Sequence, residues 1–172
     1  MAVYRPPRRR RRRRLLLAAG VQVGVTAERP TPESSADVVR RFDACGFARL
    51  LGLETAGATG GCVRVIMRTE GMENAHGTTH GGAIFALADH AFGIAGNLDG
   101  VDQTAISAHI RYFSPPATGT LEAVARKVSE TERTSVYAVD VFSGDRRVAS
   151  FEGIGFKTGA VPERGWGAGP GA

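Results

Sequence analysis

Residues 83–97, with the sequence AIFALADHAFGIAGN, decide the fold. Apart from Asp89, His90 and Asn97, every residue in this stretch is apolar or glycine, so a helix built from it is apolar around almost its whole circumference. A helix of that kind is buried on all sides, whereas a helix at the surface shows one polar face. The rest of the domain must therefore wrap around this segment.

Strand-like stretches follow the helix and are joined by turn signals such as Ser114-Pro115-Pro116. Consecutive hairpins of this type form an antiparallel sheet. We therefore predict an α+β domain in which a curved antiparallel sheet wraps around the central hydrophobic helix. The predicted strands span residues 103–113, 119–129, 134–142 and 147–157.

The segment before the central helix carries further signals. Residues 34–37 are typical of a helix start, and apolar residues recur at near-helical spacing up to Gly52, which predicts one short amphipathic helix. The glycine-rich stretch 57–61 predicts a loop. Alternation of apolar residues with arginines at 62–68 predicts a half-buried strand.

His80, Gly81 and Gly82 stand where the central helix begins. A helix start exposes unpaired backbone N–H groups at the positive end of the helix dipole, and such groups stabilise an oxyanion. Glycine has no β-carbon, so a substrate carbonyl can approach these groups closely. A tight turn from loop to helix also uses glycines, and both interpretations stay open on these residues alone.

Asp89 lies in the middle of the apolar helix, where burying an unpaired carboxylate destabilises the fold. A functional role therefore explains this residue better than a structural one. The residues on its helix face are small or aromatic, so this face can admit either a ligand or a second helix. They are Gly82, Phe85, Phe92, Gly93 and Gly96.

Gly81 and Asp89 are eight positions apart, which at ~1.5 Å of rise per residue separates them by about 12 Å along one helix. A carboxylate must come within ~3 Å of a carbonyl that it attacks, so the two groups of one chain cannot serve the same carbonyl. We therefore predict a two-fold homodimer with antiparallel central helices, in which Gly81 lies beside the partner's Asp89.

Residues 74–89, with the sequence NAHGTTHGGAIFALAD, resemble the signature of hotdog-fold thioesterases of the PaaI-like, phenylacetate-degradation branch. The resemblance runs from about Phe42 to Lys157. It implies the hotdog fold, a homodimer or a dimer of dimers, and hydrolysis of acyl-CoA to free acid and CoA without a cofactor or metal. The implied substrates are aryl-acyl thioesters such as phenylacetyl- or hydroxyphenylacetyl-CoA, or short- to medium-chain acyl-CoA.

The same resemblance implies a catalytic role for five residues. The backbone N–H of Gly81 polarises the thioester carbonyl, and the partner's Asp89 acts as nucleophile or as general base for water. Asn74 positions the water or the carboxylate, and His80 orients the loop. Ser107, on the following strand, forms a hydrogen bond near the acid. Residues expected to bind substrate are Gly82, Phe85 and Phe113.

The net charge of +5 comes from one end of the chain. Eight of the 22 basic residues are arginines in the first 14 positions, and the remainder carries 14 basic against 17 acidic residues. The body is mildly acidic, so we expect no nucleic-acid binding by the domain. Two cysteines are too few for a disulfide scaffold and indicate a reducing compartment.

The first 35 residues join the arginine run to an apolar segment and so imitate an export signal. That segment is short and is interrupted by Gly20 and Gln22, so we expect a disordered extension on a cytoplasmic protein. No apolar run reaches the ~18 to 20 residues of a membrane span. The predicted parts are the extension at 1–35, the thioesterase domain at 36–157 and a flexible tail at 158–172.

Three alternative functions are considered. A hotdog hydratase or dehydratase pairs the acid with a histidine, and Asp89 has none four or five residues later. A non-catalytic acyl-CoA-binding protein would keep the pocket but would not need Asp89. The arginine run could instead bind nucleic acid.

The histidines do not favour a metal site. His76 and His80 have the spacing of zinc ligands on a helix, but the neighbouring glycines place them in a loop, and no third ligand is evident. His90 and His109 are expected to be structural.

Overall fold

The computed structural model describes residues 33–59, 61–116 and 118–158 of the chain. Most of the predicted N-terminal extension, with its arginine run and export-like segment, lies outside the described residues, as does the predicted tail beyond Thr158. The predicted domain boundaries therefore stay predictions.

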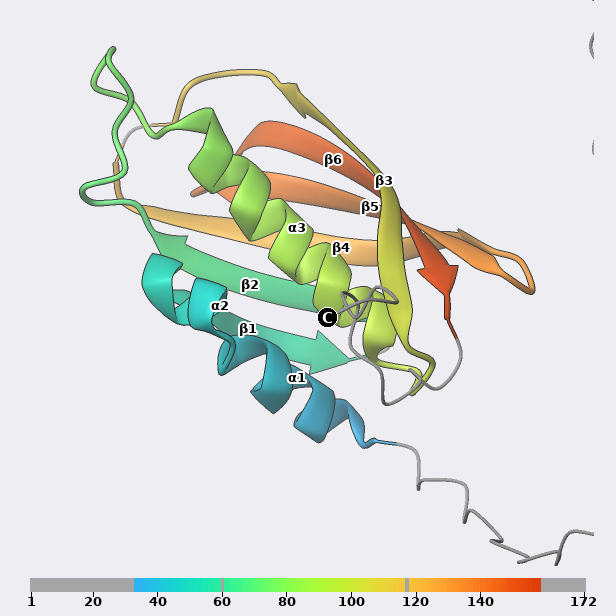
Figure 1. The fold of residues 1–172 in the computed structure, drawn as a ribbon. Helices are drawn as coiled ribbons and strands as arrows, with labels where there is room; N and C mark the ends of the chain where they lie inside the picture. The colour runs from blue at the N-terminus through green and yellow to red at the C-terminus, as the bar shows by residue number, and fades with distance from the viewer. Residues whose placement is uncertain (1–32, 60, 117, 159–172) are drawn as a thin grey trace, which may run out of the picture. The chain divides into compact units, whose positions relative to one another are not determined.

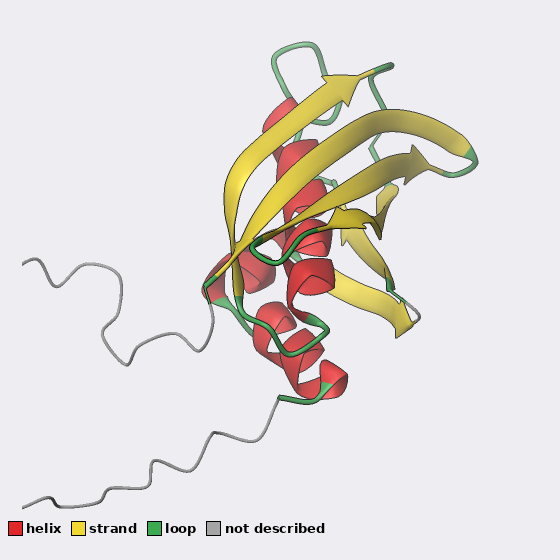
Figure 2. Cartoon of the chain, turned by 90° about the vertical axis from the view of Figure 1, so that its right-hand side faces the viewer, coloured by secondary structure: helices red, strands yellow, loops and turns green. Residues whose placement is uncertain are grey.

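Six strands form one antiparallel sheet in the order β1-β2-β4-β5-β6-β3. The sheet curves around helix α3 (Gly81–Asn97), which lies along its concave side (Figures 1 and 2). The predicted α+β architecture is confirmed, and β4, β5 and β6 form consecutive hairpins as predicted. The predicted hairpin between residues 103–113 and 119–129 is wrong, because β3 pairs with β6 at the sheet edge and not with β4. The strands are β1 (Leu53–Thr59), β2 (Cys62–Arg68), β3 (Gln103–Tyr112), β4 (Thr120–Glu130), β5 (Thr134–Ser143) and β6 (Arg146–Lys157).

The core lies between α3 and the inward face of the sheet. On α3, Leu87, Ala91 and Ile94 are fully buried, and β2 alternates as predicted, with the apolar side chains Val63, Val65 and Met67 turned inward. Full burial of a leucine or isoleucine side chain contributes roughly 1.5–3 kcal/mol. In the described part of the chain no helix, α3 included, is long and apolar enough to cross a membrane.

One strip of α3 is incompletely covered, so the prediction of burial on all sides is wrong for this strip. Gly82 is exposed, and Phe85, Asp89 and Gly93 are half-buried. The physical reason lies in the sheet, whose edge strands β1 and β3 do not pair with each other and so leave an opening along the helix. The strip contains the carboxylate that the sequence singled out.

The segment before the sheet contains two helices, α1 (Ser35–Asp43) and α2 (Gly46–Leu51), where one was predicted. Ser34 caps α1 as expected. The break occurs at Cys45, which is extended (φ −66°, ψ 151°) and whose Sγ accepts a hydrogen bond from the Ala48 N–H. This side-chain cap starts a new helix after the first one ends.

Strand β1 was not predicted, and its last residues lie in a stretch that was predicted to be a loop. Its ladder with β2 continues through Gly57 to Thr59, with a bulge between Thr55 and Gly57. Backbone hydrogen bonds to the neighbouring strand therefore override the low strand propensity of glycine.

Strand β6 lets α3 approach the sheet closely at Gly153. A Cβ at this position would lie 2.9 Å from three atoms of the Phe92 ring. Phe92 also contacts Tyr137 and Phe151, at ring-centroid distances of 5.6 and 5.8 Å. The missing side chain at 153 therefore fixes where the helix and its aromatic cluster lie.

We predict that Gly153→Ala destabilises the domain by about 1–3 kcal/mol, because the added methyl overpacks against Phe92. Urea unfolding measures the change. Gly57→Ala is the matched control, since a Cβ on that strand glycine meets nothing within 4 Å. Equal stability of the two variants would contradict this account of the packing.

Candidate active site

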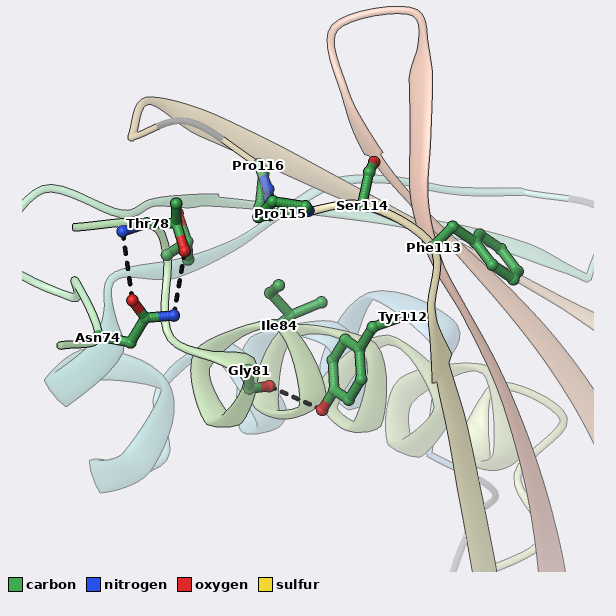
Figure 3. Close-up of a pocket in the computed structure, with 10 residues that line it drawn as sticks. Asn74, Thr78, Gly81, Ile84, Tyr112, Phe113, Ser114, Pro115 and Pro116 are labelled. Carbon is green, nitrogen blue, oxygen red and sulfur yellow. Dashed lines mark hydrogen bonds between the residues drawn. The ribbon is translucent and has the colours of Figure 1, made fainter. Parts of the chain in front are cut away.

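The loop that leads into α3 is organised by Asn74. Its Oδ1 accepts hydrogen bonds from the N–H groups of His76 (2.8 Å) and Thr78 (3.3 Å). Its Nδ2 donates to the Thr78 Oγ1 at 3.0 Å (Figure 3). Asn74 thus shapes the loop, and its predicted role toward water or the carboxylate would have to use the remaining hydrogen of its amide.

His80 is the N-cap of α3. Its backbone is extended (φ −62°, ψ 134°), and its Nδ1 accepts a hydrogen bond from the Gly82 N–H at 2.9 Å. Because Nδ1 accepts, the ring proton of neutral His80 is assigned to Nε2. This hydrogen bond ties the loop to the start of α3, as the predicted role of His80 in orienting the loop requires.

Gly81 presents a free donor at the positive end of α3. The N–H groups of Ala83 and Ile84 donate to the His80 carbonyl oxygen, and that of Gly82 donates to the His80 ring. Among the described residues none accepts a hydrogen bond from the Gly81 N–H. A substrate carbonyl is a suitable acceptor for it.

Gly81 lines a cavity of about 290 Å³ (Figure 3). Phe113, for which substrate binding was predicted, lines the cavity, and so does Ile84 from α3. Gly82 and Phe85 are absent from its lining. Phe85 instead packs edge-on against Phe151, with ring centroids 5.5 Å apart.

Asp89 lines a second cavity, of about 160 Å³. Phe42 from α1, together with Phe92 and Gly93 from α3, forms walls of this cavity, and Thr104 and Ala105 of β3 complete them. Gly81 and Asp89 of one chain therefore open onto different cavities, in agreement with the ~12 Å separation along the helix.

The Asp89 carboxylate has no hydrogen-bond donor within the described residues. Burial raises its pKa above the ordinary value of 3.8, and the charge of the nearby His90 opposes this with a smaller effect. A carboxylate that is desolvated but still ionised is a stronger base than an exposed one. Such a group suits the catalytic role predicted for Asp89.

The far end of the second cavity is closed by a polar network. Gln103 donates from Nε2 to the Gly96 carbonyl (2.6 Å) and from its backbone N–H to the Asn97 Oδ1 (3.0 Å). Ser135 donates to the Gln103 Oε1. Because these groups satisfy one another, this end can border an apolar ligand without leaving them unpaired.

Ser107 and His90, two other residues discussed from the sequence, form no hydrogen bond with Asp89 in the described chain. Ser107 is exposed on β3 just after a bulge in its ladder with β6, and no hydrogen bond joins it to Asp89 within the described chain. His90, expected to be structural, is buried with its Nε2 3.5 Å from an Asp43 carboxylate oxygen.

Sequence reasoning missed Tyr112. Its hydroxyl donates to the Gly81 carbonyl oxygen at 3.0 Å, from a position 31 residues further along the chain. Only the pairing of β3 with β6 brings this side chain over the start of α3, and no local pattern carries that information. The cavity wall at Gln103, the first residue of β3, was missed for the same reason.

Comparison with known proteins identifies the class. The model of the thioesterase superfamily matches residues 76–150. The acyl-coenzyme A thioesterase PaaI of Escherichia coli is 34% identical over 122 residues, which cover 69% of this chain and 86% of that protein. The phenylacetic acid degradation protein PaaI of Thermus thermophilus, solved as a point mutant, is 36% identical and covers 66% of this chain and 99% of its own, with a TM-score of 0.63.

A Streptococcus mutans protein solved with bound acetyl CoA is 28% identical, with a TM-score of 0.59, and covers 62% of this chain and 89% of its own. The fold and these relatives are those of a hotdog-fold thioester hydrolase. The chain belongs to the thioesterase superfamily, and within it to the PaaI-like thioesterases.

We predict that Asp89→Asn lowers kcat by about 10²-fold or more, because an amide is neither a nucleophile nor a strong base. In the native enzyme kcat should fall as acid protonates Asp89. Because burial raises the pKa of this carboxyl, the fall in kcat on the acidic side should occur at a higher pH than the ordinary pKa of an aspartate. A pH–rate profile measures its position.

The same variant should be more stable than the native protein at neutral pH. A carboxyl whose pKa is higher in the folded than in the unfolded state destabilises the fold when ionised, and this penalty disappears as pH falls through the raised pKa. Thermal unfolding of both proteins across pH reads the difference. Full activity of Asp89→Asn, or a lower stability at neutral pH, would contradict the assignment.

Proposed function

We propose that the protein hydrolyses acyl-CoA thioesters with a compact acyl group to the free acid and CoA. Aryl-acyl groups such as phenylacetyl or hydroxyphenylacetyl, and short to medium alkyl chains, are the proposed substrates. The observation that carries this choice is the 160 Å³ cavity beside Asp89. The names of the E. coli and T. thermophilus relatives and the acetyl-CoA complex of the S. mutans protein support it.

The size of this cavity suits one aromatic ring. An apolar cavity of ~150 Å³ in another protein stays dry and binds benzene. Here the rings of Phe42 and Phe92 supply apolar walls, and Gly93 and Gly96 leave room on the helix. A phenyl group held there would place its carbonyl next to the catalytic carboxylate.

The chemistry follows from the two ends of the site. The Gly81 N–H donates to the carbonyl oxygen as negative charge develops on it. If the partner's Asp89 acts as base, it takes a proton from water while the water oxygen attacks the carbonyl carbon. If it acts as nucleophile, a carboxylate oxygen attacks and water then cleaves the anhydride. In both routes the C–S bond breaks, and the CoA sulfur ends as the thiol.

Self-association supplies the missing half of each site. Strand β3 is a sheet edge, and most of its residues are exposed, including Ile106 at 59%. An exposed edge with an apolar side chain is a surface for pairing with another strand. Pairing of β3 with its copy across a two-fold axis would continue the sheet and bring the Gly81 end of one α3 toward the partner's Asp89.

Two such dimers would associate into a tetramer, a dimer of dimers. The proposal also places the enzyme in the cytoplasm, where acyl-CoA and the free thiols of Cys45 and Cys62 are both expected. Asn74 and Ser107 keep their proposed roles toward the water and the carboxylate.

We predict that Gly96→Ala shifts the acyl preference toward smaller groups. A Cβ here would lie 3.9 Å from Tyr137 and 4.0 Å from Gln103, so it fits without a clash while reducing the cavity. The ratio of kcat/KM for phenylacetyl-CoA to that for acetyl-CoA should fall about 10-fold or more.

The Gly96→Ala substitution should not lower the stability of the protein, because alanine is favoured over glycine inside a helix by about 1 kcal/mol. Gly46→Ala is the control, since its Cβ would meet nothing within 4 Å and lies on α2. An unchanged ratio for Gly96→Ala would mean that the acyl group binds elsewhere.

We predict that two inactive variants, Asp89→Asn and Gly81→Pro, restore activity when mixed. Proline removes the Gly81 N–H yet suits the first position of a helix, and the extended backbone of His80 suits the residue before proline. Random exchange makes half of the dimers hybrid, and each hybrid holds one site with both groups intact.

Activity should therefore return to about a quarter of the native value per chain. Solution mass of tagged subunits verifies that hybrids form. Verified hybrids without activity would show that the donor and the acid act within one chain.

A further inference from the structure

The Tyr112 hydroxyl makes a contact that the proposed mechanism does not use. It donates to the Gly81 carbonyl oxygen at 3.0 Å, at the start of α3 (Figure 3). Gly81 is the residue whose N–H would hold the thioester carbonyl under the proposed function, on which this inference rests. Tyr112 therefore contacts the carbonyl oxygen of the same residue whose N–H is the proposed oxyanion donor.

The peptide group between Gly81 and Gly82 is held at both of its polar ends. Its carbonyl oxygen accepts from Tyr112, and its N–H donates to the Nδ1 of His80 at 2.9 Å. Glycine has no side chain to restrict its backbone angles and is the most freely rotating residue. Two hydrogen bonds on one peptide plane restrict ψ of Gly81. The preceding peptide plane, which carries the Gly81 N–H, is held through its own carbonyl oxygen, since the His80 oxygen accepts from the N–H groups of Ala83 (2.9 Å) and Ile84 (3.3 Å). Together these contacts restrict the direction of the Gly81 N–H relative to the helix.

Tyr112 is itself anchored to the sheet. It pairs with Ala149 at the end of the β3–β6 ladder, and the next residue, Phe113, donates its N–H to the Val148 carbonyl oxygen at 2.8 Å. The ring also rests on the glycine, because a Cβ at Gly81 would lie 3.4 Å from the Tyr112 Cζ and Oη. The sheet thus supports the start of α3 through one side chain.

We propose that Tyr112 is a positioning residue that, together with His80, holds the Gly81 N–H in the direction that stabilises the oxyanion. Preorganised donors of this kind act without reorganising when charge develops. Burial raises the pKa of Tyr112 above its ordinary value of 10.0, so its hydroxyl remains a donor throughout the neutral range.

A purely structural role predicts a different pattern. Tyr112 is 50% exposed, so its side chain contributes little buried area to the fold. Loss of its hydroxyl should therefore destabilise the transition state of the reaction. It should have a smaller effect on the stability of the folded protein and on substrate binding. In kinetic terms, kcat falls and KM stays nearly constant.

The test replaces Tyr112 with phenylalanine, which keeps the ring on Gly81 and removes only the hydroxyl. One hydrogen bond of ordinary strength corresponds to a loss of about 2- to 10-fold in kcat. KM for phenylacetyl-CoA and the thermal unfolding midpoint should change little. Tyr137→Phe is the matched control, because the buried Tyr137 hydroxyl has no hydrogen-bond partner in the described structure. That variant should keep the native kcat.

A second readout needs binding but no turnover. A phenylacetyl-CoA analogue with CH₂ in place of the thioester sulfur and a ¹³C-labelled carbonyl is bound to each protein, and its carbonyl stretch is measured by infrared spectroscopy. Donation from Gly81 lowers this frequency. We expect Tyr112→Phe to return part of that shift toward the value of a carbonyl without this donor, and Tyr137→Phe to leave it unchanged.

Native kcat and carbonyl frequency in Tyr112→Phe would overturn the proposal. A loss of stability with an unchanged frequency would also overturn it, in favour of a structural role. Because the infrared measurement does not depend on hydrolysis, it tests Tyr112 separately from the assignment of Asp89 as the catalytic acid.

Discussion

The burial of one almost wholly apolar helix is the constraint on which the rest of the structure depends. No isolated strand pair could cover α3, so the chain surrounds it with a six-stranded sheet whose strong curvature follows the helix. Where the sheet ends, at β1 and β3, the helix keeps an uncovered strip, and this strip carries Asp89. The same geometry that stabilises the fold therefore leaves a desolvated carboxylate at the edge of the core, where a ligand can reach it.

The two groups of the proposed catalytic site are unpaired for different physical reasons. At Gly81 the helix leaves a donor unpaired because the first turn of any helix lacks intrahelical acceptors, and the His80 side chain satisfies only the next N–H. At Asp89 the acid is unpaired because the residues on its helix face are apolar or small, and the donors of Asn97 and Gln103, which line the same cavity, bond elsewhere. Helix rise keeps these two groups about 12 Å apart, so an efficient site needs a second chain or a different donor. The exposed β3 edge favours the second chain.

Much of this arrangement could be predicted from the sequence, because it depends on local patterns. The apolar run of α3, the alternation in β2 and the turn residues between later strands each define an element on their own. The break at Cys45 and the strand β1 could not be predicted, since one depends on a sulfur cap and the other on hydrogen bonds from a neighbour. Tyr112 and the walls at Gln103 were missed because strand register, a long-range property, brings them to the helix.

The polar contacts of α1 explain why the proposed acyl cavity has a fixed wall. Asp43 accepts hydrogen bonds from the Thr55 N–H (3.2 Å) and Oγ1 (2.7 Å), and it lies 3.5 Å from the buried His90. These contacts tie α1 to β1 and to α3 at once, and the adjacent Phe42 consequently lies over Gly93, where a Cβ would be 3.0 Å from its ring. Burial lowers the pKa of His90, so near neutral pH this histidine is mainly uncharged and stabilises the ionised Asp89 little. The histidine next to the acid thus positions a cavity wall and leaves the basicity of Asp89 to be set by desolvation.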